Sequence, residues 1–311
     1  MKRLRPLLAG CALAATLLAG CAALPPPATD GARLDTTPRI AVMSAFAPEL
    51  TLLSARLQQP AKYSINGAEF STGMLEGKPV VLFLSGISMV NAAMTTQLAL
   101  DRFKVSHIVF SGIAGGVNPQ LHVGDVTVPA QWGQYLEVLM ARETVPGRFA
   151  APSWMKDSTL PNYGMLHPRP VEVRSAAQPQ IARRFWFETD PKMLEVARAI
   201  RDVDLESCKA GQCLPRKPQL VVGGNGVSGQ AFMDNKAFRE YTFATFQANV
   251  LDMETAAVGH VAYANGVPYI AFRSLSDLAG GGEGENEIGT FMGIAADNSA
   301  RVLLAFLAAW K

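Results

Sequence analysis

Two hydrophobic patterns alternate along the chain after residue 38. Short apolar runs end in Ser- or Gly-rich junctions, and longer segments follow in which apolar residues recur every three or four positions. The first pattern is typical of buried strands and the second of amphipathic helices. We expect strands at residues 39–43, 62–71, 73–75, 80–84, 107–110, 125–128, 220–223, 250–251 and 269–274, and helices at residues 47–58, 91–103, 234–245, about 254–264 and 292–310.

This alternation predicts an α/β fold with three layers, in which helices flank a central, mainly parallel mixed sheet. An Asn66-Gly67 pair between β-rich segments predicts an added hairpin. Ligands of such folds bind at the carboxyl ends of the strands. A site is therefore expected at the Gly- and Ser-rich junctions, which are residues 85–88, 111–116, 223–229 and 276–282.

The length and the distribution of Pro and Gly indicate one folded domain. At 311 residues the chain is near the upper limit for a single hydrophobic core. Residues 141–184 contain many Pro and Gly and have poor periodicity. We interpret them as part of an insertion, at about residues 132–185, within one domain that spans residues 39–311.

The first 21 residues have the composition of an export signal. Three of the first five residues are basic, and the apolar run over residues 7–20 is too short for a comfortable membrane span. The run ends in Leu-Ala-Gly-Cys21, which resembles the lipobox of bacterial lipoproteins. We expect a signal peptide with a lipobox over residues 1–21 and a Pro-rich tether over residues 22–38. The protein would then be exported to the periplasm and anchored to the outer membrane by a lipid on Cys21. A plain cleaved signal with a chance cysteine is the alternative.

Two cysteines remain in the folded part, Cys208 and Cys213 in the segment CKAGQC. In an oxidising compartment a pair this close predicts a small loop disulfide, and two free thiols are the alternative. The four histidines are scattered, and none forms a ligand pair with these thiols, so we expect no metal site.

Charge and Gly-rich motifs narrow the class of ligand. The net charge is +2, and no Lys/Arg-rich stripe with interleaved aromatics occurs, which argues against nucleic-acid binding. The stretch SGIAGG lacks the lysine of a phosphate-binding P-loop and does not match the dinucleotide motif GxGxxG. We therefore expect no cofactor, and a small neutral ligand remains open.

Four blocks in a fixed order carry a family resemblance: AVMSAFAPELTLL, SGISMVNAA, VFSGIAGGVNPQLHVGDVTVP and LDMETAAVGHVAYANGVPYIAFRSLSD. They resemble the 5′-methylthioadenosine/S-adenosylhomocysteine nucleosidases of the nucleoside phosphorylase superfamily, over most of residues 39–310. FWFETDPKML, CLPRKP and VVGGNGVSGQAFMDN also resemble secreted plant bark-storage relatives. The resemblance implies a purine nucleosidase that releases adenine by hydrolysis, and a homodimer or larger homo-oligomer.

The resemblance also implies the catalytic residues. Hydrolysis of an N-ribosidic bond passes through a ribose with oxocarbenium character, and it needs an acid for the departing purine and a group that activates water. Asp277 matches the family's acid, and Glu49 matches its water-activating glutamate. Without the resemblance, Asp277 would be interpreted as a turn or helix cap and Glu49 as a residue that favours the helix dipole.

Five further residues match the family's substrate pocket. Glu254 would accept hydrogen bonds from the ribose hydroxyls, and Met253 would pack beneath the sugar. Phe232 would stack on the purine, Met233 would meet the base edge through its backbone, and Gly115 would line the pocket. A phenylalanine at such a position is equally well explained as core.

Three positions depart from the family pattern. Ile113 stands where the bacterial enzymes carry a serine, Gln230 stands for an aspartate and Asp252 for a glutamate. The side chain of Ile113 has no polar atom with which to order the attacking water. This change leaves open both the rate of the reaction and the identity of the nucleophile.

Two other functions stay open. A phosphorylase of this superfamily uses arginines near the first strand loop and before the central Gly-rich turn, and SAFAPEL and VFSGIAGG contain none. Arg273 could supply such a charge, although its place in IAFRSLSD favours a structural pairing. A nucleoside-binding protein without turnover is the third hypothesis. The joint presence of Glu49, Glu254 and Asp277 argues against it, because binding alone needs neither acid nor base.

Overall fold

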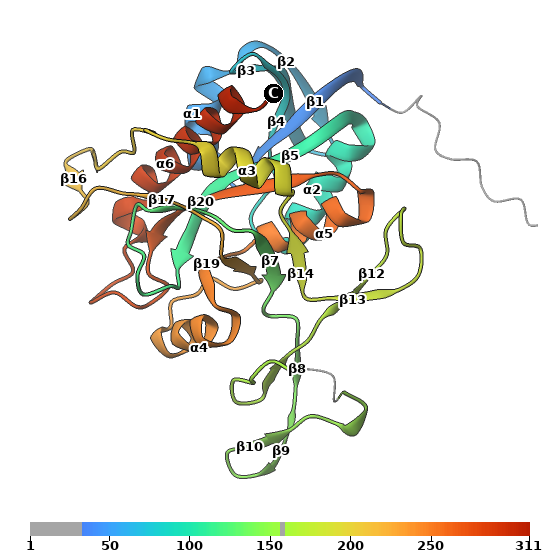
Figure 1. Ribbon diagram of the computed structural model, residues 1–311, viewed down its shortest axis with the longest axis vertical. Helices are drawn as coiled ribbons and strands as arrows, with labels where there is room; N and C mark the ends of the chain where they lie inside the picture. The colour runs from blue at the N-terminus through green and yellow to red at the C-terminus, as the bar shows by residue number, and fades with distance from the viewer. Residues whose placement is uncertain (1–32, 156–158) are drawn as a thin grey trace, which may run out of the picture. The chain divides into compact units, whose positions relative to one another are not determined.

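Twelve strands form one mixed sheet in the computed structural model, which describes residues 33–155 and 159–311 (Figure 1). From edge to edge the main path runs β14 (Trp186–Glu188), β7 (Gln131–Gln134), β18 (Asn225–Ser228), β19 (Ala248–Asp252), β5 (Phe103–Gly116), β1 (Asp35–Ser44), β4 (Lys78–Leu84), β3 (Ala68–Leu75) and β2 (Gln58–Ile65). A second branch leaves β5 through β20 (Tyr269–Asp277), β6 (Val126–Val128) and β17 (Leu220–Val222).

The centre of the sheet is parallel and its periphery is mixed. β1 pairs in parallel with β4 and β5, and β5 pairs in parallel with β20. β2 and β3 form the expected antiparallel hairpin, with positive φ at both Asn66 (52°) and Gly67 (81°) of its turn. β19 runs antiparallel to β5. The predicted α/β fold class is thus confirmed.

Alternate residues of the central strands pack into two different cores. Ala41 and Met43 of β1 contribute to the core beneath α2 (Met89–Arg102) and α5 (Thr255–Asn265). Ile40 and Val42 contribute to the core on the other face, with α1 (Ala47–Arg56), α3 (Pro191–Ala199) and α6 (Ile288–Ala309). Because both faces of these strands are covered, their sequences are continuous apolar runs. α6 is also long and apolar enough to cross a membrane, but it packs on β5 and β20 as a core helix.

The domain begins earlier than we predicted. β1 starts at Asp35, so the last four residues of the predicted tether over residues 22–38 belong to the sheet. Asp35 is the register partner of Phe103, and its carboxylate pairs with the guanidinium of Arg39. The first residues of β1 are mostly polar, so the apolar pattern did not show that they belong to the strand. The predicted signal peptide over residues 1–21, with Cys21, lies outside the described residues.

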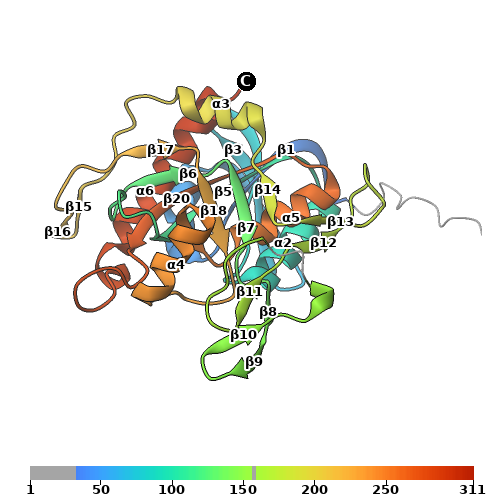
Figure 2. The ribbon, with the colours of Figure 1, turned by 60° about the horizontal axis from the view of Figure 1, so that its bottom comes forward.

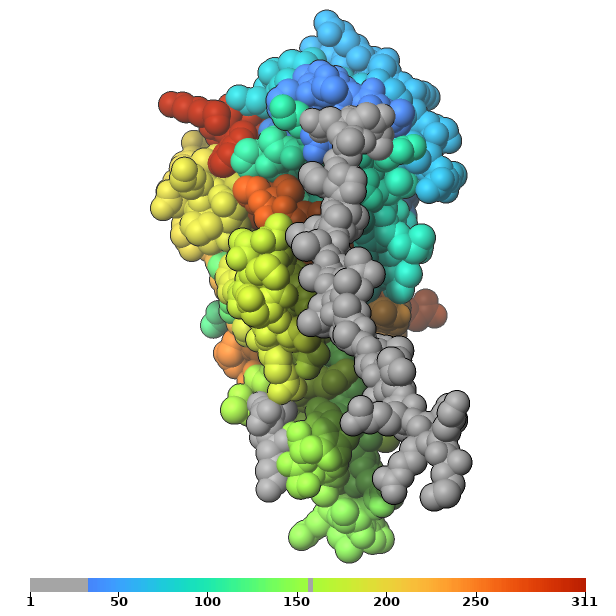
Figure 3. Space-filling view, turned by 90° about the vertical axis from the view of Figure 1, so that its right-hand side faces the viewer, coloured from blue at the N-terminus to red at the C-terminus, as the bar shows by residue number. Residues whose placement is uncertain are grey.

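The insertion also has different limits from the predicted ones. β7 and β14 pair with each other at the sheet edge, so residues 131–134 belong to the sheet, and the insertion lies between these two strands. It contains short antiparallel pairs instead of a plain loop: β8 (Val138–Met140) with β11 (Leu166–Pro168), β9 (Arg142–Val145) with β10 (Arg148–Ala150), and β12 (Val171–Val173) with β13 (Ala182–Arg184) (Figure 2). Figure 3 shows part of these residues, in light green, at the surface.

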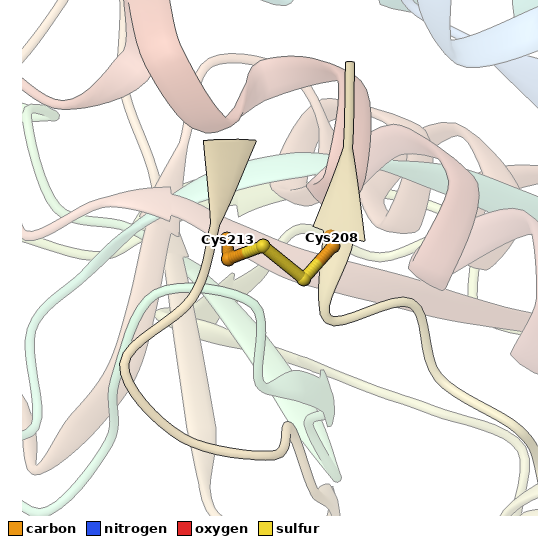
Figure 4. Close-up of a disulfide and its surroundings, with 2 residues drawn as sticks. All are labelled: Cys208 and Cys213. Carbon is orange, nitrogen blue, oxygen red and sulfur yellow. A yellow bond between two sulfur atoms is a disulfide. The ribbon is translucent and has the colours of Figure 1, made fainter. Parts of the chain in front are cut away.

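Two further features lie between β14 and β18. The helix α3 was not predicted, although Asp190 caps it through the backbone N–H of Met193 and Pro191 begins it. The short strands β15 (Cys208–Lys209) and β16 (Gln212–Cys213) form a hairpin in which Cys208 and Cys213 are joined by a disulfide (Figure 4).

Candidate active site

A cavity of about 260 Å³ opens at the ends of β5, β19 and β20 and at the start of α1 and α6. All seven residues that the sequence assigned to a pocket line it: Glu49, Gly115, Phe232, Met233, Met253, Glu254 and Asp277. Its wall also contains residues that were not predicted, among them Phe46, Ile87, Ile288 and Met292. Seven separate stretches of the sequence therefore meet here.

Glu49 is held by the backbone of two elements. It lies in the first turn of α1, where its Oε2 accepts hydrogen bonds from the N–H of Ala45 (2.7 Å) and of Phe46 (3.4 Å). Its Oε1 accepts a hydrogen bond from the N–H of Ile113 in β5 (2.7 Å). Only 2% of Glu49 is exposed. Burial raises the pKa of Glu49, while Arg273 and the three backbone N–H groups oppose the rise.

Asp252 and Glu254 lie where β19 ends and α5 begins. Asp252 accepts hydrogen bonds from the backbone N–H of Glu254 and of Thr255 (both 3.2 Å) and from the hydroxyls of Ser228 and Thr255. Glu254 Oε1 accepts a hydrogen bond from the N–H of Ser88 at 2.8 Å. Burial, with Asp252 adding to it, raises the pKa of Glu254, and Arg273 opposes the rise.

Arg273 of β20 is fully buried among these acids. Its Nε lies 2.8 Å from Asp252 Oδ2, its Nη2 3.6 Å from Glu254 Oε2 and its Nη1 3.8 Å from Glu49 Oε1. The guanidinium carbon also lies 4.1 Å from the centre of the Phe110 ring. One cation thus serves three carboxylates. We call these four charged residues the arginine cluster.

Glycine at position 112 leaves the space for this guanidinium. A Cβ at Gly112 would lie 1.8 Å from Arg273 Nη1 and 2.7 Å from Glu49 Oε1. The Gly-rich end of β5, which the sequence placed after the strand, is therefore part of the strand and contacts the arginine cluster. Its glycines permit close approach, since a Cβ at Gly116 would also lie 2.5 Å from the Leu275 side chain.

Asp277 ends β20 in a different environment. It is 3% exposed, and its Oδ1 accepts hydrogen bonds from the N–H of Ala279 (2.8 Å) and from Nδ2 of Asn286 (3.4 Å). Its Oδ2 accepts a hydrogen bond from the Ser276 hydroxyl at 2.8 Å. Burial raises the pKa of Asp277, and these neutral donors oppose the rise. Among residues 33–155 and 159–311, no Lys, Arg or His forms an ion pair with Asp277.

The remaining wall is largely apolar. Phe232 is 56% exposed, so its ring presents a free face at the cavity. Ile113 contributes its side chain to the wall while its backbone N–H holds Glu49. Apolar walls with a few directed polar groups are typical of sites for small organic ligands. In the described parts of the chain, no group of three His, Cys, Asp or Glu residues is arranged to hold a metal ion.

Residues 39–308 match the family model described as the phosphorylase superfamily. The chain belongs to this superfamily. Its curated relatives include the 5′-methylthioadenosine/S-adenosylhomocysteine nucleosidase of Bacillus licheniformis, which is 30% identical over 86% of this chain and 98% of the relative. The enzyme of the same name from Lysinibacillus sphaericus is 31% identical over 87% of this chain and 99% of its own. The predicted resemblance to these nucleosidases is thereby confirmed, whereas the resemblance to plant bark-storage proteins stays a prediction.

Several solved structures share the fold of this chain. The Colwellia psychrerythraea 5′-methylthioadenosine/S-adenosylhomocysteine nucleosidase, solved in complex with adenine, has a TM-score of 0.66 at 23% identity, over 87% of this chain and 95% of its own. The S. pneumoniae nucleosidase, solved with a transition-state inhibitor, has a TM-score of 0.64 at 24% identity, over 88% of this chain and 100% of its own. The futalosine hydrolase of Helicobacter pylori has a TM-score of 0.62 at 22% identity, over 86% and 97%.

Sequence reasoning assigned no site role to Asp252. It favoured a structural pairing for Arg273, which is confirmed, but it did not identify the acidic partners. One signal was available, because a charged residue inside the apolar strand IAFRSLSD must find buried partners. The partners lie 19 to 224 positions away in the chain, so the sequence pattern did not identify them.

Proposed function

We propose that this protein hydrolyses the N-glycosidic bond of a purine nucleoside of the 5′-methylthioadenosine/S-adenosylhomocysteine type and releases adenine. The observation that carries the proposal is a single cavity into which two buried carboxyl groups, Glu49 and Asp277, project from different elements with different partners. Superfamily membership and the names of the curated relatives support the same chemistry.

In the proposed reaction Asp277 is the general acid. Its burial favours the protonated form, against the opposing effect of its neutral hydrogen-bond donors, and this form can donate a proton to N7 of the purine. The electron pair of the glycosidic bond then moves to the base as that bond breaks. The ribose carbon left behind gains oxocarbenium character.

Glu49 supplies the complementary function. Arg273 and three backbone N–H groups favour its ionised form, which can accept a proton from a water molecule as the water oxygen bonds to the ribose carbon. Asp277 donates one proton and Glu49 accepts one, so the products are neutral adenine and a free sugar. The two side chains recover their starting charges by exchanging protons with solvent.

Three further contacts orient the nucleoside in this proposal. Glu254 accepts hydrogen bonds from the ribose hydroxyls through the oxygen that its backbone contact leaves available. Met253 packs beneath the sugar, and the exposed face of Phe232 stacks on the purine. Met233 and Gly115 complete the wall near the base.

The charge of the arginine cluster favours water over phosphate as the nucleophile. Three carboxylates around one guanidinium repel an anion, and Arg273 already contacts Asp252, Thr255 and the Ile113 carbonyl. Together with the absence of arginine from SAFAPEL and VFSGIAGG, this supports a hydrolase.

The proposal is tested by incubating the purified protein with a panel of purine nucleosides that differ at the 5′ position and measuring free base by chromatography. We expect catalytic release of adenine from 5′-thio-substituted nucleosides. Binding without release, detected by calorimetry on the same samples, would instead make the protein a nucleoside-binding protein.

We also propose that the protein is exported and carries a lipid on Cys21. The basic and apolar order of residues 1–20 supports this, and so does the exposed Cys208–Cys213 disulfide, which suits an oxidising compartment. Mass spectrometry of the mature protein should show an acylated N-terminal cysteine. A mature chain that begins elsewhere would contradict lipidation.

A homodimer or larger assembly is our proposal for the quaternary state. Ile87, Val90 and Met94 are 49%, 56% and 66% exposed, and Ile87 also lines the cavity. An exposed apolar face of this kind favours association between copies. Sedimentation of the soluble domain should give at least twice the mass of one chain.

A further inference from the structure

Asn286 links two carboxylates in the loop between β20 and α6. Its Nδ2 donates to Asp234 Oδ1 at 3.0 Å and to Asp277 Oδ1 at 3.4 Å. Its side-chain oxygen accepts a hydrogen bond from the N–H of Ile288 at 3.0 Å. Because that backbone donor requires an acceptor, the NH₂ end of Asn286 must face the carboxylates. Each of its two N–H bonds then has one acceptor.

The two oxygens of Asp277 consequently differ. Oδ1 accepts hydrogen bonds from Ala279 and from Asn286, so both of its lone pairs are engaged by donors that cannot become acceptors. Oδ2 has the Ser276 hydroxyl as its partner, which can turn and accept a hydrogen bond instead. The proton of the neutral acid therefore fits on Oδ2.

We propose that Asn286 is a positioning residue for Asp277: it occupies Oδ1 and so directs the acidic proton to Oδ2. This inference rests on the proposed function, in which Asp277 is the general acid. Asn286 does not need to touch the substrate for this role. It acts through the hydrogen bond to Asp277 and through its second bond to Asp234.

The bond to Asp234 connects the acid with the segment that carries Phe232 and Met233. Asp234 directly follows these two wall residues, and the N–H of Asn235 donates to the carbonyl of Ala279 at 3.2 Å. A Cβ at Gly280 would lie 2.4 Å from the backbone nitrogen of Asn235, so only glycine permits this approach. The loop that holds Asn286 is thus packed against the proposed base-binding wall.

The charged groups around Asp277 come from several elements. Glu287 precedes α6 and accepts a hydrogen bond from the N–H of Leu278, and Arg239 of α4 (Lys236–Phe246) donates to the carbonyl of Gly116. Asp234 precedes α4, and the three acids of the arginine cluster line the same cavity as Asp277. Glu287 raises the pKa of Asp277, whereas the Asn286 bond lowers it by favouring the ionised form. Removing that bond should therefore make Asp277 a weaker acid.

Three variants test the proposal. Asn286→Ala removes the two hydrogen bonds that this side chain donates and the one that it accepts. Asp234→Asn removes the charge at the second anchor but leaves the contact with Asp277, and Glu285→Gln changes a neighbouring exposed charge of the same loop. Two properties are measured: the pH dependence of kcat/KM for adenine release, and the titration of Asp277 by infrared spectroscopy. The Asp277→Asn variant identifies the carboxyl band.

For Asn286→Ala we expect the falling limb of the kcat/KM profile and the infrared titration to move together to higher pH by about one unit, the size of one hydrogen bond to a charged group. kcat should fall about tenfold, with KM changed less than about twofold. Asp234→Asn should move both titrations by less than half as much, and Glu285→Gln should leave both unchanged.

The proposal is overturned if Asn286→Ala lowers activity equally at every pH while the infrared titration of Asp277 stays in place, since that is the signature of a purely structural loss. A shift of the same size in Glu285→Gln would also overturn it. If the wild-type protein releases no base, the proposed function fails by itself. The infrared titration of Asn286→Ala would still decide whether Asn286 controls the proton of Asp277.

Discussion

Two groups of buried carboxyls line the same cavity in opposite electrostatic settings. In the arginine cluster, three acids share the guanidinium of Arg273 and receive several backbone N–H groups. Asp277 is equally buried but receives only neutral donors. A cation favours the ionised form of a neighbouring carboxyl, and burial without one favours the neutral form. Burial raises the pKa in both settings, but only in the arginine cluster does a cation oppose the rise. In the proposed mechanism this difference separates the proton acceptor, Glu49, from the proton donor, Asp277.

Removing the cation should have the largest effect. Arg273→Met leaves three buried carboxylates without compensation, so we expect the free energy of unfolding to fall by about 3–5 kcal/mol at neutral pH. The loss should shrink at low pH, where the acids take up protons. Urea denaturation measures it.

Arg301→Met provides the matched control. Arg301 pairs with Glu206, and both side chains are about one-third exposed, so this variant should lose less than about 1 kcal/mol. Equal losses in the two variants would contradict the claim that the buried carboxylates of the arginine cluster depend on Arg273 for charge compensation.

Replacing the carboxyl group of Asp277 should lower turnover and leave the fold intact. Asp277→Asn cannot donate the proton, so kcat should fall about 10²- to 10⁴-fold. Steady-state release of adenine measures this loss. A folded variant with wild-type turnover would exclude Asp277 from the mechanism.

The contribution of Asp277 to folding stability should depend on pH in a definite direction. The pKa of Asp277 is raised above its ordinary 3.8, so the folded state holds this proton more tightly than the unfolded chain does. Its contribution to stability is complete below about pH 4 and is lost as pH rises through the raised pKa. An asparagine does not ionise, so at pH 8 the variant should unfold at no lower urea concentration than the wild type.

The pH profile of kcat/KM should be bell-shaped, with a limb from each group. Activity needs ionised Glu49 and protonated Asp277, so the rising limb belongs to Glu49 and the falling limb to Asp277. Ser276→Ala removes a donor to ionised Asp277, so the falling limb alone should move to higher pH. Movement of the rising limb would show that a change beside Asp277 also alters the titration of Glu49.

Ile113→Ser should have the smallest effect. The backbone N–H of this residue holds Glu49, and only its side chain changes. A hydroxyl beside Glu49 can help to order the attacking water, so we expect kcat to rise about fivefold, the size of one neutral hydrogen bond. Ile113→Val, which adds no polar atom, should leave kcat unchanged. A gain in both variants would point to cavity size instead.

The strands of the core were predictable because their buried residues are apolar and form recognisable apolar runs in the sequence. β4 and β20 follow from apolar runs, and the seven pocket residues follow from the family blocks in which they stand. The limits of β1 and β7 were missed because polar residues begin β1 and flank the two buried residues of β7, and strand pairing tolerates them.

The electrostatic network was much less predictable. Arg273 and Asp252 meet across 21 positions, and Asn286 reaches Asp234 across 52, with no periodic pattern in the sequence that records either contact. α3 was missed even though Asp190 and Pro191 form an ordinary start signal, because its short apolar face follows an insertion without periodicity.

The central claim is that water attacks a purine nucleoside within this cavity. It is tested most directly by incubating the protein with 5′-methylthioadenosine, with and without phosphate, while measuring adenine, reducing sugar and the phosphorus NMR spectrum. The account predicts equal amounts of adenine and free sugar, a rate independent of phosphate, and loss of most of this activity in Glu49→Gln. A sugar 1-phosphate signal, or activity that requires phosphate, would contradict it.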